Sequence, residues 1–575
     1  MMATSVATSM QAPVFHPTVW GEYFINFTPE PLQISDEKMA ERIKELKEKV
    51  NAMFQSSKNV VEKLNLVDVV QRLGIDHHFD EQIATALASI HSSDFNSSSL
   101  HEVALRFRLL RQQGFWVSAD EFDKFKNEDG SFISGIENDP KGLLSLYNAA
   151  HLLTHGEGTL EDAILFSRRH LEAIRSSLKP PLADQVGRAL EIPLPRTLKR
   201  EEAISFISEY SNVQDQTYSP AILELAKLDF NLLQHLHQKE LKAFTQWWKD
   251  LSREIGLDYV RDRIVECYFW SYTVHYEQAN ARARMILAKL FLLTSLLDDT
   301  YDVHATLDEA RELNKAIERW DEGDVSLLPE YLKKFFVKVV SSFREFEDEL
   351  EPHEKYRNVY NRKGFQTLSN YYLQEAEWFH QGYTPSFKEQ VNVSVITAGG
   401  QVLSIGLLVG MGDIATKEAF EWIIDNADAV RACGEVSRFM DDMSAFKVFY
   451  MNSLWKVYLF VSMQNKPCID LTIIGPCSQN GRNKLDVAST VECYIKEHNV
   501  SSEVALAKIG SFVEDAWKTI NQAPFKYPAL LPVVQRVTSL AKSMTLLFLD
   551  KRDAYTYSKG FKGTLESHFI KHILI

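Results

Sequence analysis

Three aspartates close together, Asp298, Asp299 and Asp302, are the residues whose types and spacing most directly suggest chemistry. On a helix, Asp298 and Asp302 lie one turn apart on a common face, and the C-terminal end of a helix disfavours anions. Buried like charges are costly unless they are paired or bind a metal. Mg²⁺ commonly combines one or two protein carboxylates with substrate phosphates. The cluster therefore predicts a magnesium-dependent diphosphate site; hydrated aspartates at an exposed helix end are the alternative.

The segment that must position these aspartates, residues 286–297 (ILAKLFLLTSLL), is apolar on nearly all sides, which predicts a core helix. Ser35 can cap another helix, in which Met39, Ile43, Leu46 and Val50 recur at three- and four-residue spacing. Similar periodicity runs through residues 143–153, 160–174, 222–248 and 261–297, whereas alternating strand patterns are scarce. We therefore expect an all-α fold.

A chain of 575 residues is longer than one hydrophobic core usually supports, which predicts two domains. The polar tract 211–220 (SNVQDQTYSP) has the turn residues expected of a connection between helical blocks. We expect a flexible segment at 1–19, an N-terminal helical domain at 20–215 and a C-terminal catalytic domain at 221–575.

Composition excludes several classes of partner. A formal net charge of −15 argues against nucleic acid, because neutralising phosphates requires clustered Lys and Arg. The apolar run 286–297 is interrupted by Lys289 and falls short of the roughly 20 residues that a membrane span requires, so we expect no membrane span. Residues 1–12 lack the features of a signal or transit peptide, which favours the cytoplasm. We expect free thiols, because the five cysteines are scattered and form no CxxC pair: Cys267, Cys433, Cys468, Cys477 and Cys493. We also expect a monomer.

Several motifs together resemble those of plant class I terpene synthases of the cytosolic sesquiterpene type. They are HPTVWGEYF (16–24), QRLGIDHHF (71–79), RDR (261–263), ECYFW (266–270), DDTYD (298–302) and QEAEWFHQGY (374–383). The resemblance extends from residue 16 to the C-terminus, and the order and spacing of the motifs match as well. It implies a class I terpenoid synthase fold preceded by an α-barrel-like helical domain.

The resemblance also implies roles for individual residues. Mg²⁺, or Mn²⁺ in its place, would bind Asp298 and Asp302, with Asp299 in support. Glu375 matches a further acidic position near this site, with a hydrated surface charge as the alternative. Three arginines would hold the diphosphate, since guanidinium groups suit phosphate oxygens, and each could otherwise belong to a surface ion network: Arg261, Arg263 and Arg438.

An aromatic pocket would enclose the carbocation, because ring faces stabilise cations without attacking them. Trp270, Phe548 and Tyr555 match pocket positions, although an aromatic at helical spacing is more often part of a core. Asp553 and Tyr555, in RDAYTY, match a C-terminal loop that closes over the site, for which a polar surface loop is the alternative.

The sequence departs from the family in several places. The tandem arginine expected before Trp20 is replaced by Met10 and Gln11, which favours a farnesyl diphosphate enzyme, and no DxDD motif is present. The second metal motif, beginning at Asp441, has Ala445 where a hydroxyl is expected and Phe449 where a carboxylate is expected. Only Asp441 is a credible ligand there, and a pair of surface aspartates is the alternative.

Residues 448–479 have no counterpart in the family pattern. They lack Glu and Arg and contain Pro and β-branched residues within a helical region. Joining Lys447 to Asn480 restores the family spacing, so we interpret the segment as a retained intron, with a genuine surface loop as the alternative.

The sequence as a whole predicts a lyase that ionises farnesyl diphosphate with Mg²⁺ and releases a sesquiterpene and diphosphate. An inactive terpene-synthase-like protein is the alternative, supported by the segment beside Asp441. A monoterpene synthase or a chain-elongating prenyltransferase agrees less well, since an elongating enzyme typically carries two complete aspartate-rich motifs.

Overall fold

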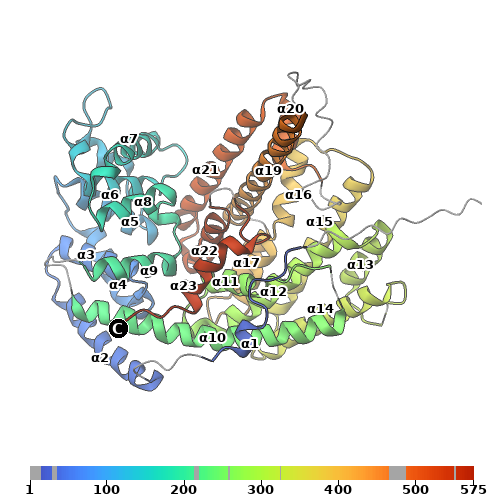
Figure 1. Ribbon diagram of the computed structural model, residues 1–575. Helices are drawn as coiled ribbons and strands as arrows, with labels where there is room; N and C mark the ends of the chain where they lie inside the picture. Colours follow the sequence, from blue (N-terminus) through green and yellow to red (C-terminus); the bar gives the residue numbers. More distant parts are fainter. Residues whose placement is uncertain are drawn as a thin grey trace, which may run out of the picture.

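Helices form two bodies that lie side by side, as the predicted all-α, two-domain fold requires (Figure 1). The computed structural model describes residues 15–28, 35–212, 219–256, 259–323, 325–425, 427–464, 487–549 and 552–575, without the side chains of 447–464. Within these ranges, β pairing is limited to one isolated bridge between Lys126 and Phe132.

The first body, coloured blue to teal in Figure 1, is an N-terminal group of helices around its own core. Its first helix shows why the sequence folds this way: the Ser35 side chain accepts a hydrogen bond from the Lys38 amide, and Met39, Ile43, Leu46 and Val50 are buried, as predicted. Its helices are α2 (Asp36–Ser56), α3 (Val60–Arg72), α4 (Asp80–Ser92), α5 (Leu100–Gln112), α6 (Pro140–Ala150), α7 (Gly158–Ile174), α8 (Leu182–Glu191) and α9 (Lys199–Tyr210).

The second body, green to red in Figure 1, holds the aspartate cluster. Its helices are α10 (Pro220–Ile255), α11 (Ile264–Val274), α12 (Ala281–Asp299), α13 (Leu307–Arg319), α14 (Glu330–Asp348), α15 (Arg357–His380), α16 (Phe387–Thr397), α17 (Gly400–Val409), α18 (Lys417–Ile424), α19 (Asp428–Gln464), α20 (Thr490–His498), α21 (Ser502–Lys526), α22 (Leu531–Leu547) and α23 (Lys562–Phe569).

The helical pattern over 261–297 divides into α11 and α12. The chain turns between them at His275, whose Nε2 lies 2.9 Å from the Leu407 carbonyl oxygen. The Arg284 guanidinium donates to the carbonyl oxygens of His275 and Glu277, 2.6 and 3.0 Å away. The turn lets α11 pack against α12, which places Trp270 and the aspartates in one part of the molecule.

Helix α10 contributes to the cores of both bodies, along the lower edge of Figure 1. Residues Ile222 to Phe230 pack in the N-terminal core, and Leu233 onward pack in the C-terminal core. The short helix α1 (Tyr23–Asn26) and Trp20 also belong to the C-terminal core, although they precede the N-terminal body in the sequence. The N-terminal arm therefore lies against the second body.

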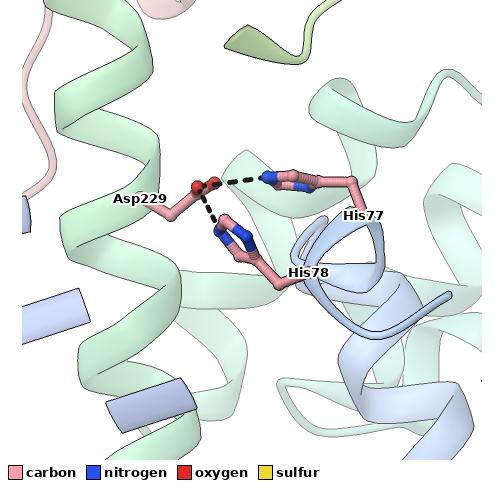
Figure 2. Close-up of side chains that lie close together, drawn as sticks. All are labelled: His77, His78 and Asp229. Atoms are coloured by element: carbon pink, nitrogen blue, oxygen red, sulfur yellow. Dashed lines mark hydrogen bonds and ion pairs between the residues drawn. The ribbon is translucent and has the colours of Figure 1, made fainter. Parts of the chain in front are cut away.

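Two histidines of the N-terminal body bond to an aspartate of α10 (Figure 2). Nε2 of His78 and of His77 lie 2.9 and 3.3 Å from the same oxygen of Asp229. Three such ligand atoms within 4.8 Å could hold a metal. However, the Arg200 guanidinium, 3.2 Å from the other oxygen of Asp229, would repel a cation here. The arrangement therefore favours a buried hydrogen-bonded junction over a metal site.

One described stretch, Phe387–Val409, is long and apolar enough to cross a membrane by length and composition. It comprises α16 and α17, and 83% of its most apolar window is buried inside the protein. Gly399, with a φ of 80°, breaks the helix in the middle of this stretch. These features are those of a core element.

Candidate active site

The aspartate cluster lies where α12 ends. Helix α12 is buried along most of its length, as its apolar sequence predicts, and it ends at Asp299. The chain continues as a wider helical turn, Thr300–His304, which contains Asp302. Asp298 and Asp302 are half-buried, whereas Asp299 is buried, with 1% of its surface exposed. The three carboxylates therefore have two different environments.

Arg261 forms ion pairs with two of these aspartates. Its Nη2 donates to Oδ2 of Asp298 at 2.6 Å, and its Nε lies 2.8 Å from Oδ1 of Asp299. The backbone N–H of Arg261 also donates to Asp299 at 2.7 Å. Asp299 thus fixes the main chain and the side chain of Arg261 together, while Asp298 and Asp302 lie nearer to solvent.

Burial also perturbs the ionisation of Asp299. Loss of hydration raises the pKa of this carboxyl group to about 6, and the nearby Asp298 adds to the effect, whereas Arg261 opposes it. The ionised form of Asp299 is therefore stabilised by the Arg261 guanidinium and not by hydration.

A second group of charges faces the aspartates from α19. Arg438 pairs with Asp441 at 2.5 Å and with Asp442 at 3.3 Å. Burial alone would lower the pKa of Arg438, but the surrounding carboxylates of Asp442, Asp441, Glu375 and Asp298 raise it above its usual value. Arg438 is therefore paired with the carboxylates of its own helix and also lies within the electrostatic influence of Glu375 and Asp298.

Asp442, in contrast, is tied to the start of α20. Its side chain is buried and accepts hydrogen bonds from the backbone N–H and the hydroxyl of Thr490, both at 2.7 Å. The hydroxyl of Ser444 donates to the Met440 carbonyl oxygen at 2.8 Å. Asp442 and Ser444 are thus engaged with protein groups, and the ligand role of Asp441 stays a prediction.

Glu375 lies on α15 and is held from the break between α16 and α17. The Thr397 hydroxyl donates to Glu375 at 3.0 Å, and the Tyr372 hydroxyl donates to the Thr397 carbonyl oxygen at 3.1 Å. Burial, and then the charges of Asp298, Asp302 and Glu375, raise the pKa of Tyr372 well above its usual value. Glu375 is buried, with 9% of its surface exposed, so the alternative of a hydrated surface charge does not describe it.

An aromatic wall forms around Phe291, two helical turns before Asp298 on α12. Trp270 stacks on Phe291 with 5.1 Å between ring centroids and 3° between ring planes, and Trp270 lies 5.0 Å from Tyr555. The Tyr555 hydroxyl donates to Oγ of Ser295 at 2.5 Å. Phe548 ends α22 within the C-terminal core, and the ring contacts described for Trp270 and Tyr555 do not include it.

The loop that carries Asp553 and Tyr555 is closed by Arg263. The Arg263 guanidinium donates to the carbonyl oxygens of Tyr555, Thr556 and Asp262 at 2.8 Å and of His16 at 3.1 Å. Asp553 accepts hydrogen bonds from the amides of Tyr555 and Thr556 at 3.0 and 2.9 Å. Arg263 is only 1% exposed, so the structure commits it to backbone oxygens of the loop and the N-terminal arm.

Comparison with known proteins decides the family. The profile for "Terpene synthase, N-terminal domain" matches residues 19–190, and that for "Terpene synthase family, metal binding domain" matches 249–463 and 477–519. The chain is 78% identical to a tau-cadinol synthase from Zea mays over 578 residues, covering 100% of both proteins. The chain belongs to the terpene synthase family. The predicted membership among the plant sesquiterpene synthases, and with it the predicted lyase class, is confirmed.

Two further similarities support this terpene synthase assignment. The chain is 60% identical to an alpha-copaene synthase from Zea mays over 567 residues, covering 97% of this chain and 99% of the relative. The crystal structure of isoprene synthase from grey poplar (Populus x canescens), in complex with three Mg²⁺ ions and dimethylallyl-S-thiolodiphosphate, superposes with a TM-score of 0.80 at 27% identity. That superposition covers 93% of this chain and 97% of the poplar chain.

The anomalous segment 448–479 falls partly outside the described residues of this terpene synthase. Helix α19 continues to Gln464, and residues 465–486 lie beyond the described ranges. The metal binding profile likewise skips residues 464–476. The bond between Asp442 and Thr490 holds the chain before the segment to the chain after it. The retained-intron interpretation stays a prediction.

Sequence reasoning missed three residues of this site: Tyr372, Thr397 and Ser295. Two of them carried a usable signal, because Tyr372 precedes Glu375 by three residues and Ser295 precedes Asp298 by three, which places each pair on one helix face. Thr397 had no such signal, since its position depends on where the chain breaks between α16 and α17.

Proposed function

We propose that this terpene synthase ionises farnesyl diphosphate with bound Mg²⁺ and releases a sesquiterpene product and diphosphate. The single observation that carries the proposal is that acidic residues on two helices each pair with an arginine: Asp298 on α12 with Arg261, and Asp441 on α19 with Arg438. Such a concentration of acidic groups around arginines suits metal ions that bridge protein carboxylates to a diphosphate.

The residues present fit Mg²⁺ as a group of hard oxygen donors. Asp298 and Asp302 would hold it on one side and Asp441 on the other, with Glu375 adjacent. When bound, Mg²⁺ neutralises the charge that develops on a departing diphosphate. Mn²⁺ could take its place. The poplar isoprene synthase, which was crystallised with Mg²⁺ and a diphosphate analogue, supports this choice.

Asp299 and Arg261 act as a pair in the proposal. Asp299 is buried against Arg261 and positions its guanidinium rather than binding metal directly. Arg261 in turn shields Asp298 from Asp299 and directs N–H donors toward the place where the diphosphate would lie. Arg438 provides the corresponding guanidinium on the α19 side.

Arg263 takes a different role from the one expected of the RDR motif. With its donors committed to carbonyl oxygens of residues 16, 262, 555 and 556, it holds the C-terminal loop and the N-terminal arm together. We propose that Arg263 limits the access of bulk water to the site by closing these segments, and that Asp553 shapes the turn of the loop.

Trp270, Phe291 and Tyr555 would stabilise the carbocation after diphosphate departs, because their ring faces are electron-rich and carry no strong nucleophile. Few and scattered cysteines suit a reducing compartment, so we propose a cytoplasmic location, and we also propose a monomer.

The test is incubation of the purified protein with farnesyl and geranyl diphosphates and Mg²⁺, followed by gas chromatography and mass spectrometry. The proposal expects C15 hydrocarbons or alcohols from farnesyl diphosphate and lower turnover of geranyl diphosphate. A longer diphosphate product would indicate a prenyltransferase. No product from the chain, with or without residues 448–479, would contradict the proposal.

A further inference from the structure

We propose that Ser295 and Tyr555 hold the water molecule that captures the final carbocation, so that this chain releases a sesquiterpene alcohol. The inference rests on the farnesyl diphosphate activity proposed above and assigns a product-determining role to two side chains of the cavity wall.

Ser295 lies between the aromatic wall and the carboxylates. Phe291, Ser295, Asp298 and Asp302 follow one another at spacings of four, three and four residues, so they share one face at the end of α12. Phe291 packs on Trp270, and Asp298 pairs with Arg261. A hydroxyl at position 295 is therefore a polar group at the border between the part that would hold the hydrocarbon and the part that would hold the diphosphate.

Tyr555, from the C-terminal loop, fixes this hydroxyl by a hydrogen bond. Its Oη donates to Ser295 Oγ at 2.5 Å and lies 3.6 Å from Sγ of Cys267. Burial raises the pKa of Tyr555 well above its usual value and that of Cys267 to about 12, so both groups stay protonated near neutral pH. The pair is a neutral, fixed hydrogen-bonding unit.

The Ser295 hydroxyl has a proton left to donate. Its Oγ accepts from Tyr555, and no acceptor for its own proton is found among the described residues. The neighbouring Thr294 differs, because its hydroxyl donates to the Phe291 carbonyl oxygen at 2.8 Å. One water can accept from Ser295 and donate to the phenol oxygen of Tyr555, which gives it the two polar partners that an ordered water needs. Its remaining lone pair is then available to the cavity.

The chemistry of this step balances without an oxidant or a reductant. A lone pair of the water oxygen forms a C–O bond to the cationic carbon, which produces a protonated alcohol. That oxonium loses one proton to an oxygen of the released diphosphate. The products are the neutral alcohol and a protonated diphosphate, and both side chains are left unchanged.

The experiment supplies farnesyl diphosphate and Mg²⁺ to the full chain in ¹⁸O-labelled water and measures labelled alcohol and hydrocarbon by gas chromatography and mass spectrometry. The wild type should release an alcohol that carries ¹⁸O. Ser295→Ala should lower the alcohol fraction about fivefold, the change expected for one lost hydrogen bond. Ser295→Thr keeps the hydroxyl and should restore the alcohol fraction.

Thr294→Val is the matched control, since it removes the adjacent hydroxyl, whose proton is already donated to the backbone. It should leave the alcohol fraction unchanged. Unlabelled or purely hydrocarbon products, an unchanged alcohol fraction in Ser295→Ala, or an equal fall in Thr294→Val would each overturn the inference while leaving the proposed synthase activity intact. Absence of any product from the wild type would instead refute the proposed function itself.

Discussion

Replacing Asp299 by Asn should change the pH dependence of stability in a defined direction. The folded protein binds a proton on Asp299 with a pKa of about 6, against 3.8 for an exposed aspartate. Because the folded-state pKa is the higher one, the stability that this group contributes is fully present below pH 3.8 and is lost as pH rises through about 6.

The magnitude follows from these two values. At 1.36 kcal/mol for each pH unit, keeping this carboxylate ionised costs the folded state about 3 kcal/mol at pH 8 relative to the protonated form. An asparagine carries no charge at any pH, so it removes this cost and its pH dependence together. One kcal/mol corresponds to on the order of 2 °C in melting temperature. The melting temperature of the wild type relative to that of Asp299→Asn should therefore rise by about 5 °C when the pH is lowered from 8 to 4.

The assay is the apparent melting temperature followed by circular dichroism in buffers that contain EDTA, so that metal binding does not interfere. Asp308→Asn is the control, because the Asp308 side chain is 93% exposed and its removal changes charge without changing a buried group. A difference between wild type and Asp299→Asn that is flat across this pH range, or that moves in the opposite direction, would refute the reasoning.

Three further perturbations test other parts of the structure. Asp229→Asn should destabilise the protein by about 3 to 5 kcal/mol at pH 7, because it leaves the buried Arg200 guanidinium without its carboxylate. Glu224→Gln is the control: it breaks a surface pair on the same helix and should cost less than about 1 kcal/mol. Equal melting temperatures for the two variants would count against the stabilising role of the Asp229 contacts. Since the pKa of Asp229 is well below its usual value, that loss should persist until the pH falls below about 4. Deletion of residues 448–479 should leave the melting temperature and farnesyl diphosphate turnover at least as high as in the full chain, and a deleted protein that fails to fold would show that the segment is needed. Arg263→Ala should increase amide hydrogen exchange in residues 15–28 and 552–557, whereas unchanged exchange there would remove Arg263 from its proposed closing role.

The sequence was sufficient for the features that depend on local periodicity. The apolar run before Asp298 predicted the core helix α12, and Ser35 with its spaced apolar residues predicted α2. In both cases, the spacing of side chains along one helix determines which face is buried, and no distant contact is needed to find it.

Features that depend on distant contacts could not be read in this way. Arg263 was expected beside the diphosphate, but its partners are carbonyl oxygens almost 300 residues later, at Tyr555 and Thr556. The anchoring of Asp442 by Thr490 also joins segments far apart in sequence. A buried arginine binds whichever acceptors the fold brings near, and motif spacing alone does not specify them.

The central claim is that Asp298 and Asp302 hold the metal needed to ionise farnesyl diphosphate. It is tested most directly by measuring diphosphate release and C15 product formation as Mg²⁺ is titrated into the wild type, Asp298→Ala and Asp302→Ala. The account predicts saturable, Mg²⁺-dependent turnover that EDTA abolishes, and a loss of at least about 100-fold in either variant, given the several kcal/mol that a metal ion supplies to such a transition state. Wild-type rates in Asp298→Ala or Asp302→Ala, or turnover that persists in EDTA, would contradict it.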